Sequence, residues 1–106
     1  MSSRAADPIL QRYRAALGAL YGARVERVVL FGSRARGEAW SESDYDIAVF
    51  LRDLTDRWRE FDQLADLGTA FLDETGAVIH AMPYPADAYH KRTSLMREIR
   101  RDGVDL

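Results

Sequence analysis

The 106-residue sequence has no cysteine, only one lysine and two histidines, and no apolar run long enough to cross a membrane as a helix. The lack of cysteine excludes disulfides and thiolate metal sites. The two histidines, His80 and His90, are too few and too far apart in sequence to propose a zinc site. The N-terminus lacks the apolar core of a signal peptide, so we expect a cytoplasmic protein with no membrane-bound part.

An excess of positive charge is also missing. The sequence has 15 Lys and Arg residues against 17 Asp and Glu residues, which gives a net charge of −2. Broad electrostatic binding of nucleic acid needs a basic surface, so we do not expect it here. The basic residues are almost all arginine, which suits bidentate contacts with phosphate or carboxylate groups.

The shortage of lysine also bears on phosphate binding. Gly32 and Gly37 have the spacing of the glycines in a P-loop, but Glu38 and Ala39 follow where a P-loop has lysine and then serine or threonine. Without the phosphate-binding lysine, the P-loop interpretation fails.

The length is enough for one compact domain, and we expect it to span residues 1–106. Apolar periodicity and turn residues predict its elements. The predicted helices cover 8–21, one turn at 33–37, about 56–72, and 94–101; the predicted strands cover 25–31, 45–51 and 77–82. A loop is expected over 40–43, and Pro83 and Pro85 are expected to end the third strand.

The order of these elements predicts the fold class. The connection between the first two strands is short, so they should pair antiparallel, whereas the helical crossover to the third strand permits a parallel pair. We therefore expect a small mixed β-sheet flanked by helices, an α/β (α+β) fold. Trp58, Phe61 and Phe71 lie on the apolar side of the helix over 56–72, and we expect them in the core.

Two acidic residues open the second strand. Alternate side chains of a strand share a face, so Asp44 and Asp46 should point the same way, with Tyr45 on the opposite side. Two carboxylates held together repel each other unless a cation lies between them. Mg²⁺ takes one or two carboxylates and completes its shell with water and phosphate oxygens. The pair therefore predicts a site for Mg²⁺ or Mn²⁺.

Gly32 and Ser33 end the first strand. An antiparallel pairing brings them next to Asp44 and Asp46, and a short helix that begins there would present backbone N–H groups to phosphate. The combination indicates a metal and a triphosphate. Ser33 has no His–Asp pair to activate it, so its expected role is a hydrogen bond to phosphate.

Two arginines follow this turn. Arg34 and Arg36 either form ion pairs with Glu38 and Glu42, or one of them contacts the triphosphate. The sequence leaves both interpretations open.

The Gly32-Ser33-x10-Asp44-x-Asp46 spacing resembles the signature of the DNA polymerase beta-type nucleotidyltransferase superfamily. The short chain, and Gly-Ser-Arg-Ala-Arg-Gly followed by Ser-Asp-Tyr-Asp, resemble the minimal nucleotidyltransferases (MNT proteins) of bacteria and archaea. The resemblance implies a polymerase beta-like fold and transfer of a nucleoside monophosphate, AMP from ATP. It implies catalytic and metal-binding roles for Asp44 and Asp46, and nucleotide contacts by Gly32, Ser33 and Arg36.

The resemblance also implies a partner. Minimal nucleotidyltransferases are commonly paired with a small helical HEPN-domain RNase toxin, in a hetero-oligomer, and act as its antitoxin. In some cases they transfer AMP to a tyrosine of the toxin. The family would thus make this chain an enzyme whose acceptor is a protein hydroxyl.

The third strand departs from the family pattern. Polymerase-type nucleotidyltransferases usually carry a third carboxylate there, but residues 77–82 contain no acid, and His80 occupies about the expected position. An imidazole suits softer ions better than Mg²⁺. The alternative is therefore a catalytically weak or inactive antitoxin that neutralises a HEPN toxin by binding alone.

Overall fold

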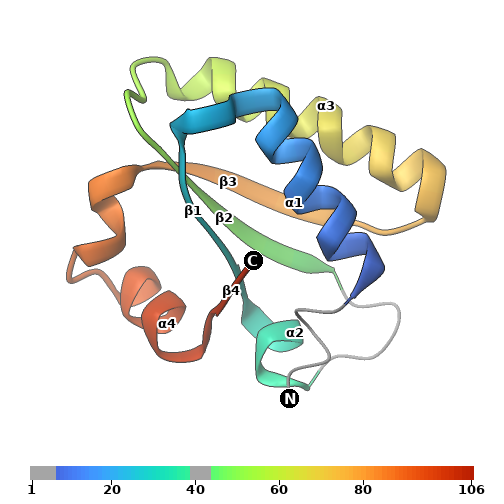
Figure 1. Cartoon of the computed structure of the whole chain (residues 1–106). Coiled ribbons are helices and arrows are strands. Elements are labelled where there is room, and N and C mark those ends of the chain that lie inside the picture. The colour runs from blue at the N-terminus through green and yellow to red at the C-terminus, as the bar shows by residue number, and fades with distance from the viewer. Residues whose placement is uncertain (1–6, 39–43) are drawn as a thin grey trace.

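A computed structural model describes residues 7–38 and 44–106. It contains a four-stranded mixed sheet with the strand order β3-β2-β1-β4, with α1 and α3 on one face and α4 on the other (Figure 1). The strands are β1 Val25–Phe31, β2 Tyr45–Leu51, β3 Ile79–Pro85 and β4 Val104–Asp105. The helices are α1 Pro8–Tyr21, α2 Gly32–Arg36, α3 Arg57–Thr75 and α4 Ser94–Asp102, with short 3₁₀ turns at Gly22–Arg24 and Ala86–His90.

The pairing of the strands confirms the predicted topology. β1 and β2 are antiparallel, and Phe31 lies opposite Asp46. β2 and β3 are parallel, and Asp46 lies opposite His80. The turn after β1 and the start of β2 therefore meet at one end of the sheet, as the short connection requires. The loop predicted over 40–43 lies outside the described residues.

The two long helices each begin at a capping aspartate. Asp7 Oδ1 accepts a hydrogen bond from the Ile9 N–H at 2.8 Å, and proline occupies the first helical position of α1. Asp56 Oδ1 accepts from the Arg59 N–H at 3.1 Å at the start of α3. α3 ends at Thr75, three residues beyond the predicted boundary at 72, and the left-handed Gly76 follows it.

The sheet separates two hydrophobic clusters. The larger lies under α1 and α3, and alternate β2 residues, Tyr45, Ile47 and Val49 among them, point into it. The smaller lies under α4, where Ala48 and Phe50 of β2 point. Because side chains alternate along a strand, Asp46 faces the α4 side, and Tyr45 is buried on the opposite side as predicted.

The third strand differs from the prediction. It begins two residues later than predicted, at Ile79, and it continues through Pro83 and Pro85 instead of ending before them. β3 is an edge strand, so an N–H group that points outward has no strand to pair with, and proline at such a position costs no ladder hydrogen bond. The prediction that the prolines end the strand was therefore wrong.

The placement of Trp58 in the core was also wrong. The residue is 79% exposed, and Phe61 is 37% exposed, whereas Phe71 is buried as predicted. α3 packs mainly on β3 at the edge of the sheet, so the apolar stripe of the helix is wider than the surface beneath it. Leu64 and Phe71 reach the core, and the residues beyond the edge remain outside.

One charged side chain is buried where α3 begins. Glu60 is 3% exposed, and its Oε2 lies 3.0 Å from Arg24 Nη2. Arg24 also donates to the carbonyl oxygens of Arg52 and Asp53, just after β2. This pair therefore links the first turn of α3 to the start of β1 and the end of β2.

The two-residue strand β4 was not predicted. Val104 lies opposite Leu30 of β1, and the Leu106 N–H donates to the Val28 carbonyl oxygen at 2.9 Å. β1 consequently has a neighbour on both sides. Over the described part of the chain, no helix has the length and apolar character of a membrane span.

Candidate active site

The predicted site residues converge at the end of the sheet where β1 ends and β2 begins. Asp44 directly precedes β2, and its side chain is 48% exposed. Asp46 is half-buried and lies opposite Phe31, the last residue of β1. The carboxylates are therefore next to the Gly32–Ser33 turn, as the antiparallel pairing predicts.

Gly32 makes the closest approach to these carboxylates. It is buried, with a φ of 75°, in the left-handed region that L residues rarely adopt. A Cβ atom at this position would lie 2.5 Å from Asp46 Oδ2. A side chain here would therefore displace the Asp46 carboxylate as well as block the approach of a ligand to the backbone.

The short helix α2 follows this glycine. The first N–H groups of any helix are not used by intrahelical hydrogen bonds, and here they belong to Gly32, Ser33 and their neighbours. Ser33 is half-buried. α2 has only five residues, so its aligned dipole is small, and its capacity to bind phosphate comes from individual N–H groups.

His80 lies beside the two carboxylates. Its Nε2 is 2.9 Å from Asp44 Oδ2, and in the sheet register it is directly opposite Asp46. Both partners of the contact are accessible, since the His80 side chain is 60% exposed. The structure therefore brings His80 of the third strand next to both acidic residues at the start of β2.

The electrostatic environment of Asp46 is unfavourable to its charge. Partial burial raises the pKa of the Asp46 carboxyl, and the nearby carboxylates of Asp44 and Glu98 raise it further. His80 and Arg36 act in the opposite direction but do not cancel these effects. A cation bound between the carboxylates would remove this destabilisation.

The two arginines after the turn are directed to different sides. The Arg34 guanidinium lies 3.8 Å from the ring centroid of Tyr45, which faces the α1 side of the sheet. Arg36 Nε lies 2.9 Å from Glu38 Oε1, and Arg36 Nη1 lies 3.6 Å from Glu98 Oε2. Arg36 is therefore the arginine near Asp46. The other carboxylate considered for these arginines, Glu42, lies outside the described residues.

Glu98 was missed by the sequence reasoning. It lies on α4, next to the buried Ile99, and brings an acidic group to Arg36. The only available signal was a single Glu in a helix whose other charged residues before Asp102 are Arg97, Arg100 and Arg101. Neither its spacing nor its sequence neighbours connect it with residues more than 50 positions earlier.

The donor set fits a metal shared with a substrate better than a closed metal site. Among residues 7–38 and 44–106, no group of three or more His, Asp or Glu side chains is arranged to hold an ion. Asp44 and Asp46 provide two carboxylates on one face, which is the number that Mg²⁺ commonly takes when phosphate and water supply the remaining oxygens.

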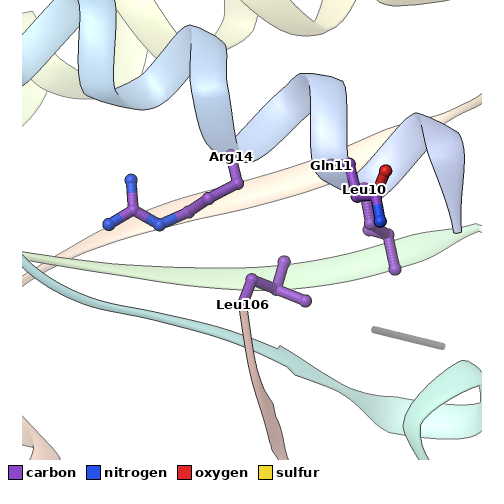
Figure 2. Close-up of a pocket in the computed structure, with 4 residues that line it drawn as sticks. All are labelled: Leu10, Gln11, Arg14 and Leu106. Carbon is purple, nitrogen blue, oxygen red and sulfur yellow. The ribbon is translucent and has the colours of Figure 1, made fainter. Parts of the chain in front are cut away.

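A separate hollow of about 210 Å³ lies between α1 and the C-terminal residue. Figure 2 shows Leu106 directed toward α1, with Leu10, Gln11 and Arg14 along the same hollow. Leu10 and Leu106 belong to the cluster on the α1 face of the sheet, opposite to the face that carries Asp46. This hollow is therefore not part of the candidate site.

Comparisons with known proteins agree with the geometry. The family described as "Polymerase beta, Nucleotidyltransferase" matches residues 19–104. A relative from Methanocaldococcus jannaschii, named "Putative protein adenylyltransferase MJ0604", is 32% identical over 99 residues, which cover 92% of this chain and 93% of the relative.

Solved structures show the same fold. A crystal structure of a toxin–antitoxin with AMP-PNP superposes with a TM-score of 0.60 at 21% identity, over 89% of this chain and 69% of the other. A mutant of the toxin–antitoxin MntA–HpeT superposes with a TM-score of 0.59 at 21% identity, over 91% of this chain and 70% of the other. At this identity the likeness establishes the architecture, a mixed sheet with flanking helices.

The contact between Gly32 and Asp46 can be tested with a matched pair of glycine variants. Gly32→Ala and Gly76→Ala each place an alanine at a φ of about 75°, so each should lose at least about 1–2 kcal/mol of unfolding free energy from the backbone conformation alone. Only at Gly32 does the new Cβ meet Asp46, since nothing lies within 4 Å of a Cβ at Gly76. Calorimetric titration should therefore show weakened Mg²⁺ binding for Gly32→Ala and unchanged binding for Gly76→Ala. Equal Mg²⁺ affinities would contradict the contact.

The raised pKa of Asp46 predicts the sign of a stability change. The folded protein holds the Asp46 proton more tightly than the unfolded chain does, so stability falls as pH rises through the carboxyl range and stays lower above it. Near neutral pH and without metal, Asp46→Asn should therefore melt at a higher temperature than the wild type. Its gain in unfolding free energy should be under about 1 kcal/mol, because solvent screens the half-exposed group. The difference should shrink as the pH falls. Asp62→Asn, on the exposed surface of α3, is the control, and a lower melting temperature for Asp46→Asn would contradict the prediction.

Proposed function

The chain belongs to the polymerase beta nucleotidyltransferase family, and from this premise we propose that it transfers AMP from ATP onto a hydroxyl group of a partner protein in a metal-dependent reaction. The observation that supports this most directly is the position of Asp46, whose carboxylate lies against the backbone of Gly32 at the turn into α2. Acidic side chains and free backbone N–H groups are thereby brought to one place. A site for a nucleotide triphosphate with its cation needs both.

The two carboxylates would hold the ion. Asp44 and Asp46 would bind Mg²⁺ or Mn²⁺, which supplies positive charge between the carboxylates and the phosphates. Asp46 is held in place by the register of β2 against β1, and Asp44 by its contact with His80. Two fixed carboxylates lose little freedom when the ion binds.

The turn after β1 would hold the phosphates. The backbone N–H groups of Gly32 and Ser33, and the Ser33 hydroxyl, would donate to phosphate oxygens. Arg36 would exchange its contact with Glu38 for one with the β- or γ-phosphate. With the nucleotide so oriented, the acceptor hydroxyl attacks the α-phosphorus and pyrophosphate leaves. The contribution of the protein is positioning and charge stabilisation.

His80 would act on Asp44. With the proton on Nε2, the imidazole donates to Asp44 Oδ2 and orients the carboxylate, as outer-shell groups do around many metal ligands. A neutral imidazole also adds no negative charge to a site in which Asp44 and Glu98 already act on Asp46. In this role His80 would allow Asp44 and Asp46 to hold the metal ion without a third carboxylate.

We further propose that the acceptor belongs to a toxin and that the chain is its antitoxin. The superposed structures are toxin–antitoxin proteins, and the relative at 32% identity is named a protein adenylyltransferase. The partner we expect is a small helical HEPN-domain RNase, joined to this chain in a hetero-oligomer. The proposal includes a cytoplasmic location.

A second candidate function is neutralisation of the toxin by binding alone. It is favoured by one observation, the absence of an acid on β3 where the family pattern has one, since a two-metal reaction prefers three carboxylates. The two functions differ in whether the partner carries AMP after incubation with ATP.

Loss of either carboxylate tests the proposed reaction. Asp44→Asn and Asp46→Asn should each lower transfer of labelled AMP from ATP to the helical partner by about a hundredfold or more, the order found when a stabilising group is removed from a transition state. Their circular dichroism spectra should match the wild type. Asp87→Asn, at an exposed residue of the 3₁₀ turn after β3, is the control. Full transfer by both variants would remove these residues from the site, and no transfer by the wild type would favour binding alone.

Substitution of His80 tests whether this residue stands where a third carboxylate would complete the metal site. His80→Asp brings a third carboxylate against Asp44 and Asp46, so without metal it should melt lower than the wild type. Added Mg²⁺ should raise its melting temperature more than that of the wild type, and Mg²⁺-dependent transfer should increase. His90→Asp, at the other histidine, should show neither effect. If Mg²⁺ raises the melting temperature of His80→Asp by no more than that of the wild type, His80 is excluded from the site.

A further inference from the structure

An exposed apolar groove lies between α3 and the open edge of β3. Arg57, Trp58, Phe61 and Met82 line a hollow of about 420 Å³ at the N-terminal end of α3. The two aromatic rings meet edge to face, with centroids 6.4 Å apart, and Trp58 remains 79% exposed. A large, rigid aromatic side chain in this position has the character of an interface residue.

A second hollow lies toward the other end of α3, and we count both hollows as one groove because they follow the same side of the helix. Leu72 and Val78 are 46% and 39% exposed, and they line this second hollow of about 180 Å³ together with Ala65, Gly68, Thr69 and Ile79. Exposed apolar side chains thus follow α3 along most of its length. Contiguous patches of this kind mark sites of association more often than single exposed residues do.

The edge of β3 beside this groove is poorly suited to pairing with another strand. The Tyr45 N–H donates to the Val78 carbonyl oxygen at 2.9 Å, and the alternation of a parallel ladder then directs the backbone of Pro83 and Pro85 outward. Neither proline has an N–H group to donate, and the Pro83 carbonyl oxygen already accepts from Arg57 Nε at 3.3 Å. Backbone pairing is therefore weakened at the end of β3 next to Trp58, which favours a helix that binds through its side chains.

The first turn of α3 carries Arg57, which lines the groove, and Arg59, but the charged residues of α3 after this turn are all acidic. Residues 60–90 contain no Lys or Arg, and Asp62, Asp66 and Asp73 are exposed on α3. A partner helix that carries Lys or Arg on both sides of its apolar stripe would be complementary to this border. A helix with acidic flanks would be repelled.

The groove also adjoins the candidate active site. Met82, which lines the hollow beside Trp58, is two residues from His80 on β3 and points to the same face of the sheet. His80 contacts Asp44. A helix bound in the groove would therefore bring the rest of its protein to the edge where the carboxylates lie.

We propose that the groove between α3 and β3 binds an amphipathic helix of the acceptor protein, with its apolar stripe on Trp58, Phe61 and Leu72 and its basic flanks toward Asp62 and Asp66. This inference rests on the proposed function for the identity of the occupant. It adds the surface that holds the acceptor protein while its hydroxyl is at the site.

The test uses the full chain and a synthetic amphipathic peptide of about five helical turns, with leucine on one face and lysine on both flanks. Fluorescence anisotropy of the labelled peptide should show saturable binding. Trp58→Ser and the double variant Asp62→Lys/Asp66→Lys should each weaken it about tenfold or more. Leu20→Ser, at an exposed leucine of α1, is the matched control and should bind as the wild type does. The same peptide with glutamate flanks should bind more weakly to the wild type and more tightly to the double variant.

The outcomes distinguish a failure of the proposed groove from a failure of the proposed reaction. Asp44→Asn should bind the peptide normally, so loss of transfer with retained binding leaves the groove intact, whereas transfer by Asp44→Asn would overturn only the proposed reaction. Equal binding by the groove variants and the wild type, or no binding by the wild type, overturns the inference. Light scattering supplies a further check, since a wild-type dimer that Trp58→Ser converts to a monomer would assign the groove to a second copy of this chain.

Discussion

The contact between the Asp46 carboxylate and the Gly32 backbone is the constraint on which the rest of the site depends. It exists because β1 and β2 are antiparallel with Phe31 opposite Asp46, so the turn that ends one strand lies against the start of the other. A residue without a Cβ atom is required at that turn. The register of two core strands thereby sets the distance between the carboxylate and the N–H groups of α2, without any flexible side chain between them.

The charge balance around this contact explains why nucleotide and cation would bind together. Asp44 and Glu98 act on Asp46 from two directions, and the opposing charge of Arg36 is shared with Glu38 and Glu98. A triphosphate that arrived alone would meet a surplus of negative charge. A cation bound by two carboxylates would be incompletely coordinated without phosphate or water. The cation would therefore offset the negative charge that the triphosphate meets, and the triphosphate would complete the coordination of the cation.

Much of this arrangement could be predicted because it depends on local sequence. Capping by Asp7 and Asp56 and the alternation around Tyr45 are properties of neighbouring residues, and the short connection after residue 31 required an antiparallel pair. The polymerase beta-like fold predicted from the Gly-Ser and Asp-x-Asp spacing agrees with the family match and the superposed structures.

What could not be predicted depends on partners distant in the chain. The exposure of Trp58 depends on how far α3 extends beyond the sheet, and the strand conformation of Pro83 depends on β3 being an edge. β4 has two residues, too few to show a period, and Glu98 reaches the site only through the packing of α4. The family resemblance indicated His80 as a third position, but its place opposite Asp46 required the register of a parallel pair, which periodicity does not specify.

The strand order also determines which strands can unfold locally. β1 and β2, which carry the site, are the two inner strands, while β3 and the short β4 form the edges. Native proteins open locally in units that begin with their least protected segments, so the edges can detach and return while the inner pair stays closed. Backbone amides that β1 and β2 donate to each other would then exchange with solvent deuterium only in the rare global opening. The groove and the C-terminal strand could fluctuate without moving Asp46 away from Gly32.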